Sequence, residues 1–229
     1  PMAPGLWRRN IATTENRGFR VEGELAAEPG IWRAGLDGFS EGHDSNIDNP
    51  NNPMFFVVNF NDARRDVYGA YLEHEREFAR NWRVELGARV NRVSTDAAAV
   101  NGTPAMMMPP AQALRDTFNA EDRDRSETNV DLVAKLTRRL DDETALDLVI
   151  AHKQRAPSYQ ERYLWLPLEA TAGLADGQRY LGNAALDSER AQQVEFGIDL
   201  VAGSLQLHPR AFYYRIDDYI QGVPADAGG

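Results

Sequence analysis

The sequence predicts an all-β protein, an antiparallel up-and-down meander of about eight long strands. The first observation behind this prediction is alternation. In the predicted strand 82–94, Trp, Val, Leu and Ala take every second position from Trp82 to Val90, and Arg, Glu, Gly and Asn fill the positions between them and Asn91. A repeat of two residues is the period of a strand and not of a helix. The second observation is that short turns alternate with long loops, of which the longest covers residues 95–128.

Four hairpins account for the predicted strands. Each consists of two alternating segments joined by a short turn, such as Glu28-Pro29-Gly30, whose composition is typical of turns. In chain order, the hairpins pair residues 18–27 with 31–41, 65–79 with 82–94, 129–140 with 145–156, and 191–202 with 205–220. Most of these segments are longer than the roughly five or six residues of an ordinary globular strand.

Long polar segments separate the hairpins. Residues 1–16 are predicted to be loop, and so are residues 42–62, apart from a short strand at Met54–Asn59. The strand that begins at Ala145 stops at Pro157, because proline has no N–H group and restrains the residue before it. From there a loop runs to about Ser188, far beyond the usual connection length.

Composition excludes several classes of protein. The net charge of -10 and the absence of a basic stripe argue against binding of nucleic acid. Without Cys, the chain has neither disulfides nor thiolate metal sites. No run of eighteen apolar residues predicts a spanning helix, and residues 1–10 lack the apolar core of a secretion signal. We therefore expect both ends of the chain to be cuts through a larger protein.

No catalytic motif is visible in the sequence. It contains no Gly-rich phosphate loop and no plausible set of nucleophile, His and carboxylate. We therefore expect neither an enzyme nor a bound cofactor.

The two faces of the predicted strands differ in chemistry. One carries Phe, Val, Leu, Ile, Ala and Trp, and the other carries Glu, Arg, Asp, Lys and Gly. Trp32 and Trp82 lie beside the short turns, and Tyr213 lies near the far end of its strand, as in the aromatic girdles of outer-membrane barrels. Short turns at one rim and long loops at the other are typical of such barrels too. A soluble β-sandwich binding module, with the apolar face as its core, is the alternative.

Two segments carry a resemblance to a known family. Arg155-Ala-Pro-Ser-Tyr-Gln-Glu-Arg-Tyr163, and Leu181-Gly-Asn183 followed by Leu186-Asp-Ser-Glu189, resemble motifs of TonB-dependent outer-membrane receptors. The strand around Glu195-Phe-Gly197 and the segment Phe212–Ile220 follow in the family's order. Two prolines of the usual second motif are missing in Ala184-Ala-Leu-Asp-Ser-Glu189.

The resemblance implies a plugged, roughly 22-stranded transmembrane β-barrel. Residues 1–229 would be a partial barrel, with the plug domain and the remaining strands absent. The implied partners are outer-membrane lipid, the TonB complex acting through the absent plug, and a metal or metal chelate as ligand. The implied location is the outer membrane of a Gram-negative bacterium.

The segment Tyr159-Gln-Glu-Arg-Tyr-Leu-Trp-Leu-Pro-Leu168 resembles the copper receptor group of this family, which implies copper as the transported ligand. Thioether sulfur suits Cu(I), so Met106, Met107 and Met108 are the predicted metal ligands in the loop after residue 94. Such Met clusters also serve as adaptable packing. Met54 could join from the neighbouring loop, and His43 is a further candidate beside Asp44.

A siderophore or another chelate is the alternative ligand. In that case, loop aromatics would stack on the ligand, instead of methionines coordinating a metal. The predicted ligand-loop residues are Arg155, Tyr159, Glu161, Tyr163 and Trp165, and Tyr180 is a further aromatic candidate.

Overall fold

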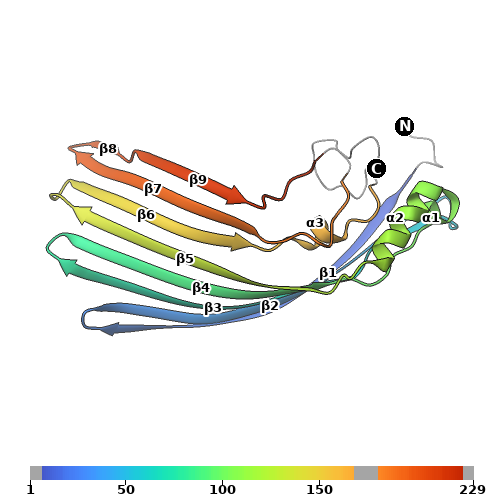
Figure 1. The fold of residues 1–229 in the computed structure, drawn as a ribbon, viewed down its shortest axis with the longest axis horizontal. Helices are drawn as coiled ribbons and strands as arrows, with labels where there is room; N and C mark the ends of the chain where they lie inside the picture. The colour runs from blue at the N-terminus through green and yellow to red at the C-terminus, as the bar shows by residue number, and fades with distance from the viewer. Residues whose placement is uncertain (1–6, 168–179, 224–229) are drawn as a thin grey trace.

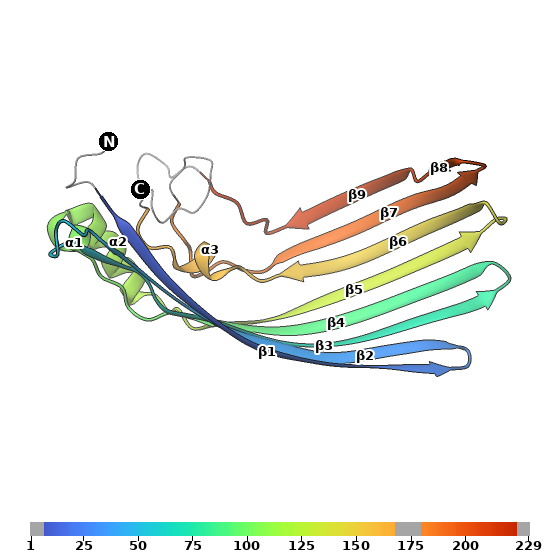
Figure 2. The same cartoon turned by 180° about the vertical axis from the view of Figure 1, so that it is seen from behind.

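The computed structural model describes residues 7–167 and 180–223, which form one curved antiparallel sheet (Figures 1 and 2). Each strand pairs with the next strand in sequence from β1 to β7, and the last two strands, β8 and β9, both pair with β7. The strands are β1 Arg9–Ala27, β2 Gly30–Asp48, β3 Phe56–Ala79, β4 Trp82–Asp96, β5 Arg125–Arg139, β6 Thr144–Arg155, β7 Glu189–Ala202, β8 Leu205–Leu207 and β9 Arg210–Asp217. The predicted meander is confirmed, and the predicted β-sandwich alternative is wrong, because the described strands form one sheet.

The four predicted hairpins are all present. The last arm is divided into β8 and β9, which are separated by His208 and Pro209. Since proline donates no backbone hydrogen bond, the ladder with β7 is interrupted there. β8 and β9 together therefore correspond to the predicted eighth strand.

Strands β1 to β5 and β7 extend further toward the long loops than predicted. Residues 9–16, predicted as loop, pair with β2, and the predicted loop at 42–62 shrinks to residues 49–55. The extensions of β1 and β2 are mainly polar, and several of their side chains bind partners on the neighbouring strand. Thr14 Oγ1 lies 2.8 Å from His43 Nδ1, for example, and Arg9 pairs with Asp48. Composition predicts loop here because it cannot show cross-strand partners. Residues 1–6 of the predicted loop lie outside the described residues.

The long loops gather at one end of the sheet and the short turns at the other (Figure 1). The loop after β4 contains α1 Thr103–Met107 and α2 Pro109–Ala120, and the loop after β6 contains α3 Tyr159–Tyr163. α3 begins with a capping box, in which Ser158 Oγ accepts from Glu161 N and Glu161 Oε2 accepts from Ser158 N. No helix in the described part of the chain has the length and apolarity needed to cross a membrane.

The main hydrophobic core lies among these loops and not on the sheet's apolar face. It joins the loop-side ends of β2 and β3 to α1, α2 and the segment after α3. We call this cluster the loop core; its buried members are Ile47, Val57, Phe60, Ala63, Ala97, Val100, Ala105, Ala111, Phe118, Tyr163, Leu164, Trp165, Leu166 and Ala184. The long loops after β4 and β6 are thereby packed into one unit with the ends of β2 and β3 at the rim of the sheet.

The apolar face of the sheet is exposed along its middle. Leu36, Leu72 and Leu86 are 57%, 48% and 48% exposed. In the register, Val21, Leu36, Ala70, Val90 and Val130 form one row across five strands. Toward the loops, this face becomes polar at the row Arg17-Ser40-Asp66-Ser94. An exposed apolar band with a polar limit on its loop side is typical of a lipid-facing barrel wall.

Candidate functional site

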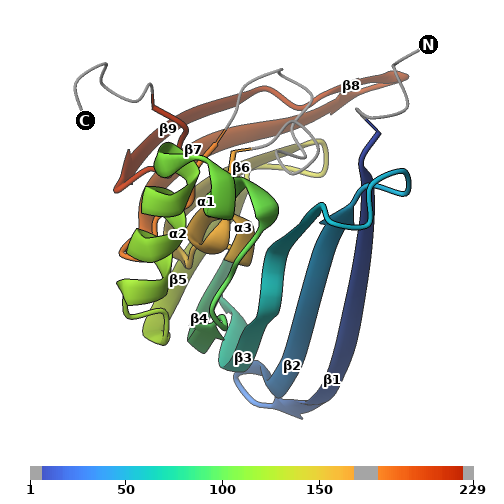
Figure 3. The same ribbon diagram turned by 90° about the vertical axis from the view of Figure 1, so that its right-hand side faces the viewer.

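The opposite face of the sheet is concave and charged, and it encloses a hollow of about 980 Å³. Figure 3 shows the strands arranged as an arc around this side. The lining comes from β1 to β6 and includes Glu22, Arg33, Tyr71, Arg89, Asp131 and Lys153. A water-soluble ligand would contact the sheet on this polar face.

Three glycines let long side chains lie flat across this face. Arg89 on β4 passes over Gly69 on β3 and binds Asp37 on β2 through two hydrogen bonds of 2.6 and 2.7 Å. A Cβ atom at Gly69 would collide with the Arg89 guanidinium. Glycine in the middle strand is therefore what permits a contact between strands that are not neighbours.

The same arrangement recurs near both edges of the sheet, at β1 to β3 and at β6 to β9. Tyr71 lies over Gly35 on β2 and donates a 3.1 Å hydrogen bond to Glu22 on β1. Arg210 on β9 lies over Gly197 on β7, and its Nη2 atom is 3.8 Å from Asp147 Oδ2 on β6. In each case the long side chain lies flat over the glycine of the middle strand.

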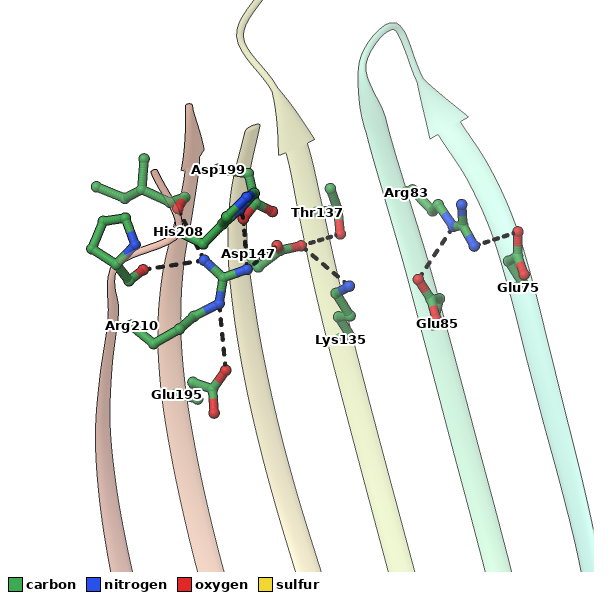
Figure 4. A network of polar contacts seen from close by, with 12 residues as sticks. Glu75, Arg83, Glu85, Lys135, Thr137, Asp147, Glu195, Asp199, His208 and Arg210 are labelled. Carbon is green, nitrogen blue, oxygen red and sulfur yellow. Dashed lines mark hydrogen bonds and ion pairs between the residues drawn. The ribbon is translucent and has the colours of Figure 1, made fainter. Parts of the chain in front are cut away.

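A further network neutralises charge near the short turns (Figure 4). Arg83 bridges Glu75 at 2.8 Å and Glu85 at 3.2 Å. Asp147 accepts a 2.6 Å hydrogen bond from Thr137 and lies 3.4 Å from Lys135 Nζ. Most carboxylates in this part of the wall therefore have a cationic partner.

Replacing Gly69 by Val is expected to destabilise the sheet by about 1–3 kcal/mol, because the new side chain displaces Arg89 from Asp37. Urea titration of the complete receptor in lipid vesicles measures this. Gly87→Val is the matched control, since a Cβ atom there meets only Glu73 Cγ at 3.7 Å. The same substitution is also made in an Asp37→Ala background. If Gly69→Val lowers the free energy of unfolding by the same amount there as in the wild-type protein, the effect does not depend on the Arg89–Asp37 pair.

The rim above the concave face is held by Arg162 and Tyr163 of α3. Arg162 is 2% exposed, pairs with Glu127, and donates to Thr95 Oγ1 at 2.7 Å and to the Leu186 carbonyl at 2.9 Å. Tyr163 Oη donates to the Arg123 carbonyl at 2.7 Å and lies 2.9 Å from Thr95 Oγ1. Burial raises the pKa of Tyr163 above its usual range, so the phenol stays neutral.

Ion pairs anchor the start of the α3 loop. Arg155 at the end of β6 binds Glu189 at 2.7 Å and Glu161 at 2.9 Å. Burial alone would raise the pKa of the Glu161 carboxyl. Hydrogen bonds from Arg155 and from the Ser158 backbone outweigh burial and hold this pKa below its usual range. Glu161 therefore stays ionised and continues to bind Arg155 and cap α3 at neutral pH.

The predicted ligand-loop residues divide into two groups. Tyr163 and Trp165 are 1% and 2% exposed and pack in the loop core, where Trp165 Nε1 donates to the Val58 carbonyl at 2.9 Å. Arg155 and Glu161 bind each other, and Tyr159 lies 4.8 Å from the His43 ring between centroids. Tyr180 packs partly buried against the loop core. The structure gives these side chains structural contacts, and their contact with a ligand stays a prediction. Leu168, the end of the quoted motif, lies outside the described residues.

The predicted methionines are exposed on the loop side. Met106, Met107 and Met108 are 58%, 76% and 51% exposed at the junction of α1 and α2. Met54, 81% exposed, lies on an adjacent segment, because its carbonyl accepts a 3.0 Å hydrogen bond from Thr103 Oγ1 at the start of α1. His43 lies separately, against Phe60 and Tyr159. Within residues 7–167 and 180–223, no group of three or more His, Cys, Asp or Glu could hold a metal ion.

Sequence reasoning missed Arg162 and the three glycines. Arg162 belongs to a quoted motif, but no pattern marks it as buried. Gly35, Gly69 and Gly197 occupy polar-face positions of alternating strands, a signal that is readable only once the register is known.

A family model described as TonB dependent receptor-like, beta-barrel, matches residues 7–229. No curated protein sequence matches the chain significantly.

Solved structures with the same fold include three receptors of similar architecture. A copper transporter, OprC, is 18% identical over 93% of this chain, with a TM-score of 0.68. The hemophore receptor HasR of Serratia marcescens is 16% identical over 93% of this chain, with a TM-score of 0.59. The alcaligin receptor FauA of Bordetella pertussis is 15% identical over 95%, with a TM-score of 0.53. The chain spans about a third of the length of these proteins, namely 31%, 34% and 31%.

Proposed function

Because this chain belongs to the TonB-dependent receptor β-barrel family, we propose that it is one sector of an outer-membrane barrel that imports a metal, with copper as the cargo. The sector supplies lipid-facing wall, polar lumen wall and part of the extracellular rim. The plug domain and the other strands belong to the rest of the receptor, and TonB supplies energy through that plug. The family is one of transport receptors.

The exposed methionines are the observation that supports copper. Four thioethers, of Met54, Met106, Met107 and Met108, lie exposed on two segments joined by the Thr103 hydrogen bonds to Met54 O and Phe56 N, both 3.0 Å. Exposed methionines contribute little to a core. Soft thioether sulfur binds Cu(I) in preference to hard cations. We propose that this methionine patch captures copper at the rim before it enters the lumen.

An intact metal chelate is the second candidate cargo. The similar structures include receptors whose titles name alcaligin and a hemophore with heme, so this architecture accommodates large ligands. The polar, neutralised concave face suits passage of such a molecule, and Tyr159 at the rim supplies an aromatic surface.

The test replaces Met54, Met106, Met107 and Met108 by Leu in the complete receptor. Uptake of copper by cells should fall at least about tenfold, because leucine keeps volume and hydrophobicity but removes the sulfur ligands. Leu114→Met, which alters a partly buried side chain of α2, is the matched control and should leave uptake unchanged. Undiminished copper uptake by the quadruple variant, at equal receptor abundance, would refute copper capture by this patch.

A further inference from the structure

Arg65 is a cation without a partner on the concave face. Its Nε atom is buried and makes no hydrogen bond, no ion pair to Arg65 is found among the described residues, and its guanidinium carbon lies 5.4 Å from the centroid of the Phe39 ring. The neighbouring Arg64 points to the opposite face and binds Asp62 through two hydrogen bonds of 2.9 Å. A buried donor left unsatisfied is costly, so the bare Arg65 guanidinium calls for an acceptor.

The groups around Arg65 do not supply that acceptor. Glu41 lies directly opposite in the β2–β3 register, but it makes no ion pair with Arg65. The nearby Arg155 is a like charge, and it is already bound to Glu161 and Glu189. Among the described residues, the structure therefore leaves a cation and a carboxylate near each other without an ion pair between them.

His43 faces the same side of β2 two residues beyond Glu41. Its Nδ1 atom contacts Thr14 Oγ1 at 2.8 Å, and its ring packs against Tyr159 and Phe60. The contacts of the described residues leave its Nε2 atom available. Glu41 and His43 thus offer two donors to a metal ion beside the guanidinium of Arg65.

We propose that Arg65 binds a carboxylate of an incoming metal chelate, while Glu41 and His43 face its metal ion. This inference rests on the proposed uptake function and narrows its cargo to complexes that carry a carboxylate. The planar guanidinium matches a carboxylate with two parallel hydrogen bonds, and the Phe39 ring supports that plane. Two protein donors do not complete a metal site, so the ion arrives with ligands of its own. Arg65 offers no acceptor to a bare cation, so its role depends on the carboxylate that the metal complex carries.

Isothermal titration calorimetry on the complete receptor in detergent tests this with three probes, namely citrate alone, Cu²⁺ alone and the Cu²⁺–citrate complex. Wild-type receptor should bind citrate and the complex. Arg65→Gln should weaken the binding of citrate and of the complex at least about tenfold, because a charge-assisted pair is lost. The same variant should bind Cu²⁺ alone as the wild-type receptor does. Arg65→Lys keeps the charge without the planar fork and should bind citrate with intermediate affinity.

Arg64→Gln is the matched control, because it removes the same charge from the other face of the same strand. Thermal unfolding of each variant separates a binding defect from a folding defect. The proposal is overturned if wild-type receptor does not bind citrate, if Arg65→Gln binds it as wild type does, or if Arg64→Gln loses as much affinity. If the methionine variants import copper normally while Arg65→Gln still loses citrate, copper capture by the methionine patch fails and the carboxylate site stands.

Discussion

Trp165→Ala is expected to destabilise the loop core by about 3–5 kcal/mol, because it leaves a large cavity and removes a hydrogen bond. The side chain is 2% exposed, and its Nε1 atom donates to the Val58 carbonyl at 2.9 Å. That carbonyl belongs to β3, so the bond ties the loop after β6 to the hairpin formed by β3 and β4. The loop core contains parts of the two long loops after β4 and β6, and we expect both to loosen together.

Hydrogen exchange of the complete receptor measures this effect, with protection read separately in segments 97–120 and 159–166. Trp165→Phe keeps most of the packing and should lose much less protection. Trp7→Ala is the matched control, since Trp7 is 58% exposed and its loss should change stability by less than about 0.5 kcal/mol. Faster exchange confined to segment 159–166 would show that the two loops do not form one cooperative unit.

Leu86→Arg is expected to destabilise the folded receptor in a bilayer by about 2–4 kcal/mol, as a charge at the centre of a lipid-facing band does. Leu86 is 48% exposed near the middle of the apolar segment of β4, between His74 on β3 and Ala134 on β5. Exposed leucine on a water-facing surface would tolerate arginine at almost no cost. The size of the effect therefore reports which medium this face contacts.

Gly87→Arg supplies the control for this substitution, because the next residue points to the concave face. There a Cβ atom meets only Glu73 Cγ at 3.7 Å, and the carboxylate of Glu73 can pair with the new charge. Urea titration of the complete receptor in phospholipid vesicles compares the two variants. Equal stability of Leu86→Arg and wild-type receptor in vesicles would rule out lipid contact at this position.

The hairpins were predictable because strand periodicity and turn composition are local properties. Segment 82–94 alternates regularly as far as Asn91 and forms β4, and short turns on one side with long loops on the other predicted the correct meander. The ends of the strands were not predictable in the same way. Residues 9–16 and 42–48 are polar, and their strand structure depends on partners such as Thr14 and His43, which are far apart in sequence.

The candidate site also has features that the sequence predicts and features that only the structure shows. Methionine identity and loop position predict a soft-metal patch that Met54 could join, and in the structure Thr103 links the segment of Met54 to the start of α1. The isolation of Arg65 is invisible in the sequence, since Arg64 and Arg65 are adjacent and identical in type. Only the pleat, which sends one to Asp62 and leaves the other without an acceptor, distinguishes them.

By itself, the sequence determined the alternation of strands, their order and the chemistry of the two faces, because each of these is written in residues close together in the chain. The tertiary structure decided which side chains cross glycines to reach a second strand, which aromatics are buried in the loop core, and which cation stays unpaired. Those outcomes depend on register and on packing between distant loops, and no local pattern encodes either.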